Sequence, residues 1–318
     1  MAQEIPVVLT TNNPRSDVTI GRTVTMLVTS LRPHQWVKNL FVLAPLLFGQ
    51  KLTDLGALTN ATIGFAAFCM LSSAVYIFND WWDAEEDRAH PEKRNRPISS
   101  GALSASLALF VALVLVAGGI ALGFVVGKVF AGICLVYSLL MAAYCMWLKR
   151  AIVLDAMTIA GGFVLRVLAG AVAVQVAATH WLIACTFLLA LFLAFAKRRQ
   201  ELLILEDGAM NHREVLNHYS LSYLDSVINI VIGASIVCYA LYTVAPETVA
   251  RFGTDNLVYG TAFVVYGMLR YLALIRDQAK GGNPTKLLLS DLPLLMTLAG
   301  WALYNGAVIY SRSLAGLI

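Results

Sequence analysis

The chain has 318 residues, of which 59% are hydrophobic and only 13% are charged, and its formal net charge is +4. Because soluble domains carry about 25% charged residues, this composition excludes an ordinary soluble domain and indicates a membrane protein with several crossings. The five cysteines lie inside apolar runs without paired spacing. Such cysteines are typical of buried side chains rather than of disulfides, metal ligands or nucleophiles.

The predicted elements begin with a flexible cytosolic tail over residues 1–30, whose first part lacks the apolar core of a signal peptide. Residues 31–318 are predicted to form a single transmembrane domain. No strand pattern appears, and a backbone in lipid must satisfy its own hydrogen bonds, so the predicted fold is an all-α, polytopic bundle of about nine helices. The apolar runs of spanning length are 39–57, 60–79, 102–122, 125–147, 151–174, 181–196, 226–245, 257–275 and 289–310.

The distribution of positive charge predicts the orientation of these helices. With the N-terminus in the cytosol, most of the 23 Lys and Arg residues fall in cytosolic segments. The outer side then holds only Lys51, Lys128, Arg251 and Arg312. Most acidic residues also fall on the cytosolic side, which topology rules do not require. This second asymmetry indicates that a functional site faces the cytosol.

One segment at the end of the second predicted helix carries an amide and five carboxylates within ten residues. At helical spacing Asp80, Asp83 and Asp87 share one face, and Asn79 lies one turn from Asp83. Oxygen ligands without nearby His or Cys favour Mg²⁺, which commonly also holds phosphate oxygens. We predict that Asn79, Asp83 and Asp87 bind the metal and that Asp80 supports them. The alternative is a solvated acidic loop.

Cations follow this acidic segment directly. Lys93, Arg94 and Arg96 are either topology determinants or contacts to phosphate oxygens that the metal does not reach. Their position beside the carboxylates favours the second interpretation for Lys93 and Arg96. Earlier in the chain, Gln35 and Lys38 share one face of the first helix, where a snorkelling lysine is an equal alternative.

Further charged residues lie in and around the fifth and sixth predicted helices. Lys149 precedes the fifth helix, and Asp155 and Arg166 share one of its faces about 16 Å apart. A cation inside an apolar run is costly, so Arg166 should face the bundle interior, paired with an acid in a structural ion pair or with a ligand. Arg198 belongs to a triple cation that either anchors the sixth helix or binds a second phosphate.

Together these residues resemble the UbiA superfamily of intramembrane prenyltransferases, through Asn79-Asp80-x-x-Asp83-x-x-x-Asp87 at the end of the second helix. The decaprenyl-phosphate phosphoribosyltransferase branch is more similar than the others. Its further motifs here are Arg32-Pro33-x-Gln35-Trp36-x-Lys38-Asn39, Asp87-Arg88-x-His90-Pro91-x-Lys93-Arg94-x-Arg96-Pro97-Ile98, Leu148-Lys149, Asp155, Leu165-Arg166, Lys197-Arg198-Arg199-x-Glu201 and Gly281-Gly282-x-Pro284 with Leu288-Leu289-x-Asp291. Aromatic prenyltransferases of the superfamily resemble one another in a second Asp-x-x-x-Asp motif after the sixth helix, which this sequence does not have there.

The resemblance implies a Mg²⁺-dependent transfer of 5-phosphoribose from phosphoribosyl diphosphate (PRPP) to a polyprenyl phosphate of the decaprenyl type, at the cytosolic face of the plasma membrane. Asp80, Asp83 and Asp87 would be catalytic. The substrate-binding residues would be Gln35, Lys38, Lys93, Arg96, Lys149, Asp155, Arg166 and Arg198. Prenyl transfer from a prenyl diphosphate to an aromatic acceptor is an open alternative, and a membrane transporter is a less favoured one. No nucleic-acid partner is expected, and a homo-oligomer is left open.

Overall fold

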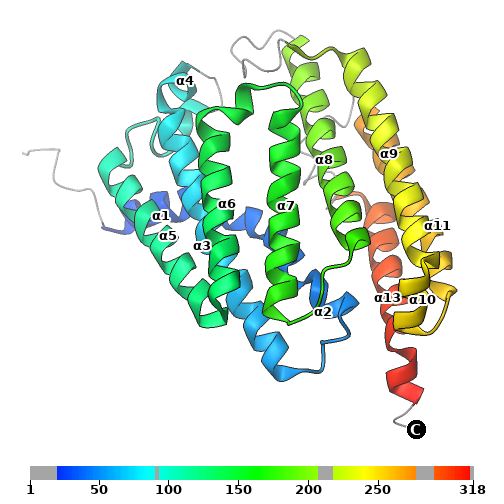
Figure 1. Ribbon diagram of the computed structural model, residues 1–318. Helices are drawn as coiled ribbons and strands as arrows, with labels where there is room; N and C mark the ends of the chain where they lie inside the picture. The colour runs from blue at the N-terminus through cyan, green and yellow to red at the C-terminus, as the bar shows by residue number, and fades with distance from the viewer. Residues whose placement is uncertain (1–19, 90–92, 207–217, 277–289, 316–318) are drawn as a thin grey trace, which may run out of the picture.

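The structure, a computed structural model, describes residues 20–89, 93–206, 218–276 and 290–315, and these ranges contain helices and no strand. Figure 1 shows the helices side by side in one bundle. The elements are α1 (Ile20–Leu31), η1 (Pro33–Leu43), α2 (Ala44–Phe48), α3 (Leu55–Trp82), α4 (Ala84–Ala89), η2 (Lys93–Asn95), α5 (Ala105–Val126), α6 (Lys128–Met146), η3 (Leu148–Arg150), α7 (Leu154–Ala173), α8 (His180–Glu206), α9 (Leu221–Val244), α10 (Pro246–Phe252), η5 (Asn256–Gly260), α11 (Thr261–Arg276) and α13 (Leu292–Ala315).

Eight helices in the described ranges are long and apolar enough to cross a membrane. They are α3, α5, α6, α7, α8, α9, α11 with the preceding η5, and α13. The predicted all-α, polytopic fold is confirmed, with eight such helices where about nine were expected. The cytosolic position of the N-terminus stays a prediction, and the Gly281–Pro284 motif lies outside the described residues.

The difference lies in the first predicted span, 39–57, which is not one continuous helix. The chain instead forms the short helices η1 and α2, turns after Phe48, and begins α3 at Leu55. Pro33 and Pro45 stand in the first turns of η1 and α2. Proline has no N–H donor and breaks a longer helix in its interior, which explains why this apolar run is divided.

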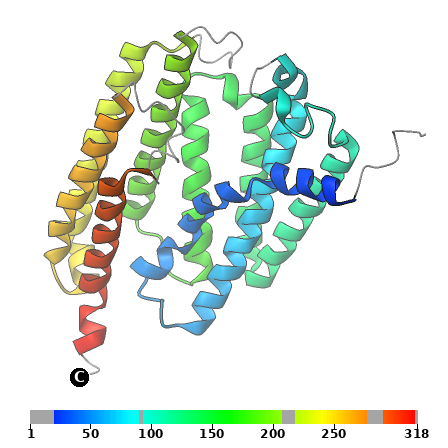
Figure 2. The same cartoon turned by 180° about the vertical axis from the view of Figure 1, so that it is seen from behind.

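The N-terminal segment differs from the prediction as well. Residues 20–30, which the sequence placed in the flexible tail, belong to α1. Its apolar residues Met26, Leu27 and Leu31 pack against the core shared by α3 and α5, and this burial accounts for the helix. Figure 2 shows α1 lying across the bundle and continuing through η1 towards α2.

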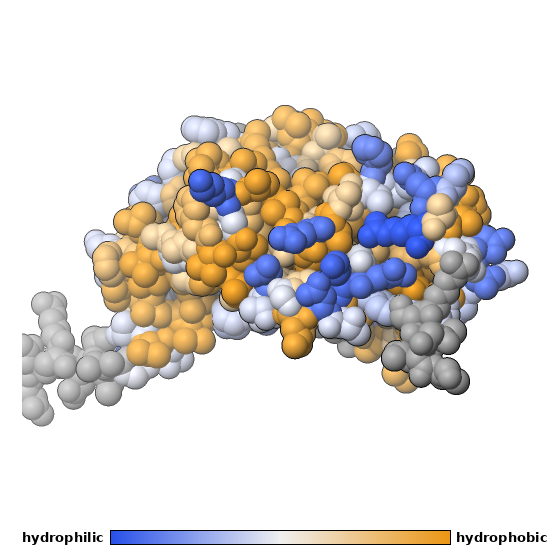
Figure 3. Space-filling model, turned by 60° about the horizontal axis from the view of Figure 1, so that its bottom comes forward, coloured by the Kyte–Doolittle hydropathy of each residue, from blue (hydrophilic) through white to orange (hydrophobic). Residues whose placement is uncertain are grey.

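The outer surface of the bundle is strongly apolar. On α5 the side chains of Phe110, Leu113 and Phe124 are 62%, 67% and 61% exposed. Figure 3 shows apolar side chains over much of the lower face, with a group of polar side chains among them. Apolar surface of this extent is unfavourable in water and fits contact with lipid chains.

The polar segments gather at one end of the bundle. Figure 1 shows the end of α3, α4, the connection from α6 to α7 and the end of α8 there. Since α3 leads directly into α4, and η3 directly precedes α7, the charged residues of distant segments are brought to the same end. This arrangement positions the candidate site.

Candidate active site

The acidic segment keeps helical spacing across the end of α3. The N–H of Asp83 donates to the carbonyl oxygen of Asn79 at 3.0 Å, and the N–H of Asp87 donates to that of Asp83 at 2.8 Å. The guanidinium of Arg96 joins two of the carboxylates. Its Nη1 lies 3.0 Å from Asp80 Oδ1 and 2.6 Å from Asp87 Oδ2. Arg96 thus joins Asp80 and Asp87, which the sequence placed on one helix face, while its predicted contact with phosphate stays a prediction.

Further cations pair with the acidic residues of this segment. Arg32 Nη2 lies 2.7 Å from Asp80 Oδ1, so Asp80 contacts two guanidinium groups. The ammonium of Lys149 in η3 pairs with Asp83. Arg150 Nη2 lies 3.2 Å from Glu86 Oε1. The acidic end of α3 is thus surrounded by cations from three separate parts of the chain.

Two of these cations were not among the predicted site residues. Arg32 precedes Pro33, its backbone φ of 52° lies in the left-handed region, and its side chain contacts Asp80 of α3. Arg150 directly follows Lys149. The only sequence signals for them were their positions beside predicted residues, because their acidic partners are 48 and 64 residues away.

Two carboxylates of the acidic segment are buried. Asp80 and Asp87 are 2% and 3% exposed. Burial raises the pKa of Asp87, and the nearby charges of Arg96 and Lys93 oppose that effect. The cation partners therefore compensate for the cost of removing these carboxylates from water.

The donor chemistry here fits a hard metal ion. Within the described ranges, no three His, Cys, Asp or Glu side chains lie close enough to hold a metal by themselves. Mg²⁺, however, is usually held by one or two carboxylates and completes its coordination with water and substrate phosphates. Asp83, Asp87 and the half-buried amide of Asn79 follow one another at single helical turns and supply such a set.

A second polar group is closed to solvent. Arg198 Nε lies 2.5 Å from Asp155 Oδ2, and the two residues are 2% and 0% exposed. Arg198 Nη1 also lies 2.9 Å from Glu201, and its Nη2 donates to the hydroxyl of Tyr144 at 3.3 Å. Tyr219 donates to the other oxygen of Asp155 at 2.9 Å. Asp155 and Arg198 were both predicted to contact substrate, and the structure places them against each other.

Arg166 lies buried in the bundle with neutral partners. It donates to Asn39 Oδ1 at 2.8 Å, to the Gly162 carbonyl at 2.9 Å and to the Tyr137 hydroxyl at 2.8 Å. The expectation that it faces the bundle interior agrees with this position. Its contact with Asn39 fixes η1 against α7, and the rings of Tyr137 and Phe163 lie 4.8 and 5.3 Å from the guanidinium carbon.

Gln35 and Lys38 both lie in η1, which is outside the eight spanning helices. In the part of the chain that the structure describes, the ammonium of Lys38 has no ion-pair or hydrogen-bond partner. Burial, and then the positive charges of Lys197, Arg166 and Arg32, lower the pKa of Lys38 to about 7. A half-buried lysine among other cations is well suited to receive an anion.

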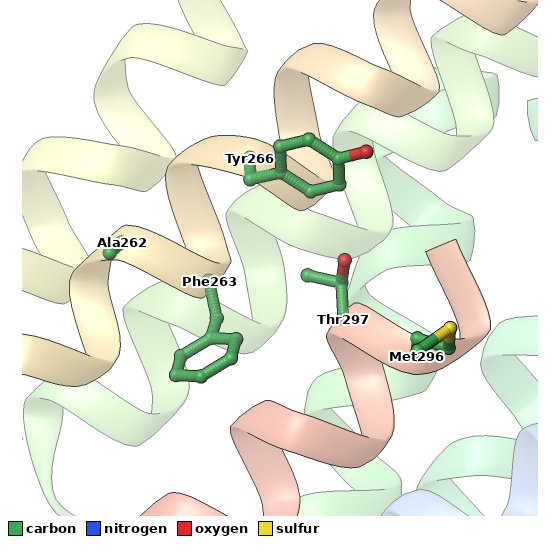
Figure 4. A pocket seen from close by; sticks show the side chains of 5 residues that line it. All are labelled: Ala262, Phe263, Tyr266, Met296 and Thr297. Carbon is green, nitrogen blue, oxygen red and sulfur yellow. The ribbon is translucent and has the colours of Figure 1, made fainter. Parts of the chain in front are cut away.

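An apolar cavity of about 710 Å³ adjoins η1. It is lined by Leu40 and Phe41 from η1, by Leu189 and Leu193 from α8, and by further apolar residues of α9, α11 and α13. Phe263 and Thr297 also line a smaller pocket of about 380 Å³ between α11 and α13, shown in Figure 4. The larger cavity therefore begins at Leu40, two residues after Lys38 in η1.

Comparison with known protein families shows to which family the chain belongs. The model of the UbiA prenyltransferase family matches residues 40–292. The chain belongs to this family. A decaprenyl-phosphate phosphoribosyltransferase from Mycolicibacterium smegmatis is 32% identical over 90% of this chain and 93% of its own length. A protein with the same name from Corynebacterium glutamicum is 34% identical over 89% of this chain and 86% of its own length.

The fold of the chain is also that of solved UbiA structures. The structure of a UbiA homolog from Archaeoglobus fulgidus bound to DMAPP and Mg²⁺ superimposes with a TM-score of 0.70. It covers 89% of this chain and 99% of the archaeal one, at 18% identity. At that identity the likeness establishes the fold of this UbiA-family chain and says nothing more about its substrate.

Proposed function

We propose that this UbiA-family chain transfers 5-phosphoribose from PRPP to a polyprenyl phosphate of the decaprenyl type and releases diphosphate. The observation that carries the proposal is the group of cations that gathers around a single acidic cluster, where Arg32, Arg96, Lys149 and Arg150 each contact a carboxylate. The names of the two bacterial relatives, which match nearly the whole chain, support the same reaction. The charge distribution favours the cytosolic face of the plasma membrane for the site.

The charges of the substrates explain why so many cations are needed. PRPP carries a diphosphate and a 5-phosphate, and the lipid acceptor brings a further phosphate. A prenyl diphosphate with an aromatic acceptor carries only one diphosphate. Guanidinium and ammonium groups bind phosphate oxygens through charge-assisted hydrogen bonds. The cations around α3 therefore suit the first pair of substrates better than the second.

The reaction is a substitution at C1 of the ribose. The bond from C1 to the diphosphate oxygen breaks and its electron pair leaves with diphosphate, while an oxygen of the lipid phosphate forms the new bond to C1. The acceptor phosphate is already an anion at neutral pH, so no strong general base is required. Asn79, Asp83 and Asp87 would hold Mg²⁺, which would supply positive charge to the departing diphosphate. Asp80 holds Arg32 and Arg96 beside it.

The donor contacts follow from the positions of the cations. Lys93, Arg96 and Lys149 lie beside the acidic cluster and bind the phosphates of PRPP, with Gln35 on η1 as a further contact. Asp155, Arg198 and Arg166 are buried and bonded to protein groups. For these three we therefore propose that they fix the elements around the site, in place of the direct substrate contacts that the sequence suggested.

Lys38 is our choice for the phosphate of the lipid acceptor. Its neighbours Leu40 and Phe41 line the apolar cavity, whose volume and lining suit part of a prenyl chain. A lipid placed there would bring its phosphate towards η1, where Lys38 has no partner in the described residues. The rest of the prenyl chain would extend into the bilayer.

Incubation of the purified protein with labelled PRPP, polyprenyl phosphate and Mg²⁺ tests this function. We expect label to enter the lipid phase, to stop after chelation of the metal, and to return when Mg²⁺ is added back. A parallel reaction uses a prenyl diphosphate and an aromatic acceptor. Product only in that parallel reaction would overturn the proposal in favour of aromatic prenyl transfer, and solute flux without conversion would indicate a transporter.

A further inference from the structure

A strained turn connects η3 to α7. Val153 has φ 66° and ψ −45°, a conformation that a β-branched residue rarely adopts. The N–H of Leu154 donates to the carbonyl oxygen of Ile152 at 2.7 Å, so Val153 is the central residue of a γ-turn of the uncommon positive-φ type. Such backbone strain persists only where the surroundings hold it.

The hydroxyl of Tyr219, which precedes α9, holds this turn through hydrogen bonds. It accepts a hydrogen bond from the N–H of Val153 at 2.7 Å and donates one to Asp155 at 2.9 Å. Tyr219 is 5% exposed, and burial raises the pKa of its phenol, so the hydroxyl keeps the proton that it donates. Arg198 in turn fixes Asp155. The contact crosses 66 residues of sequence, from the start of α9 to the start of α7.

The turn determines where η3 lies. Lys149 and Arg150 are the last residues of η3, and they pair with Asp83 at the end of α3 and with Glu86 in α4. If the turn at Val153 relaxed to negative φ, the direction of the chain entering η3 would change, and Lys149 would move away from Asp83. In the described ranges the Tyr219 hydroxyl bonds only to Val153 and Asp155, neither of which belongs to the acidic cluster. Tyr219 therefore acts on the site through the turn and is not itself a catalytic residue.

We propose that Tyr219 is a positioning residue, whose hydroxyl holds the strained turn at Val153 and thereby presents Lys149 to Asp83. The part of the proposal that concerns transfer rests on the proposed function. Tyr219→Phe keeps the ring and removes only the hydroxyl. We expect kcat with PRPP to fall about ten-fold, the rate equivalent of one buried hydrogen bond.

A second substitution separates positioning from simple packing. Glycine adopts positive φ without strain, so Val153→Gly in the Tyr219→Phe background should restore most of the lost kcat. Tyr223→Phe is the matched control, because Tyr223 lies one turn further along α9 and its side chain is 40% exposed. Full activity of Tyr219→Phe, or a double variant no more active than Tyr219→Phe, would overturn the proposal.

Hydrogen exchange gives an outcome that does not depend on activity. The Val153 amide should exchange slowly in the intact chain and faster in Tyr219→Phe, while the Tyr223→Phe chain should match the wild type. Unchanged exchange at Val153 in Tyr219→Phe would contradict the role of the hydroxyl. A wild-type chain that transfers no phosphoribose would instead refute the proposed function, and the exchange experiment would still decide whether Tyr219 holds the turn.

Discussion

At the residue scale, the site consists of carboxylates that are each engaged by a cation. Asp83 differs from Asp80 and Asp87 because its partner is an ammonium group, that of Lys149 in η3, whereas theirs are guanidinium groups. In the proposed reaction Asp83 releases this lysine to a substrate phosphate and binds the metal. The acid at this position is therefore central to the chemistry.

Asp83→Asn should reduce phosphoribosyl transfer by at least about a hundred-fold, because the amide cannot supply the negative charge that would hold the metal. The protein should remain folded, which thermal unfolding in detergent would verify. Glu85→Gln is the matched control, since Glu85 is an exposed acid on the adjacent α4. Near-normal Mg²⁺-dependent transfer by Asp83→Asn would refute the assignment of the acidic cluster.

In the proposed reaction we expect Lys38 to make acceptor binding sensitive to pH. Its pKa of about 7 in the free protein means that the ammonium form disappears as the pH rises above neutrality. Because an anionic phosphate binds that form, KM for polyprenyl phosphate should rise by roughly ten-fold per pH unit above this pKa. In Lys38→Arg the guanidinium stays charged, so the rise should disappear. An identical rise in both proteins would show that another group titrates.

At the element scale, the position of η1 depends on close contact with α7. A Cβ atom at Gly170 would lie 2.0 Å from the carbonyl oxygen of Val42 and 3.1 Å from Pro45 Cδ. The helices can approach this closely only because α7 has glycine there. The buried contact between Arg166 and Asn39 joins the same two elements one turn earlier on α7.

Gly170→Ala should push η1 away from α7 and weaken both transfer and stability. We expect a loss of stability of about 1–3 kcal/mol, typical of an overpacked core, and a higher KM for the lipid. Gly132→Ala on α6 serves as the control, because a Cβ there meets no atom within 4 Å. Equal thermal unfolding of the two variants would mean that the close approach of η1 is unimportant.

The same elements show how far the sequence could be interpreted. The long apolar runs predicted α5 to α9 well, since lipid permits few alternatives to a helix. The run 39–57 was misleading because its hydrophobicity resembles that of a span, while Pro45 divides it. The partners of Asp155 and Arg166 could not be predicted, because helical spacing relates residues on one helix, whereas these contacts cross 43 and 127 residues.

At the scale of the whole molecule, the charged site and the apolar cavity adjoin the same segment, η1. Cations and acids from α3, α4, η2 and η3 lie at one end of the bundle, and apolar residues from α8, α9, α11 and α13 surround the cavity. This arrangement allows a water-soluble phosphorylated donor and a lipid acceptor to meet. The acidic motif and its local cations were predictable, but the cavity was not, because segments far apart in the sequence form it.

The central claim concerns which atoms of PRPP reach the lipid, and a double-label experiment tests it most directly. PRPP carries one phosphorus label at the 5-phosphate and a different one at the terminal phosphate of the diphosphate. We predict that the purified wild-type protein moves the 5-phosphate label into the lipid phase and leaves the second label in water as diphosphate, in equal amounts. Both labels entering the lipid, or neither, would contradict the account.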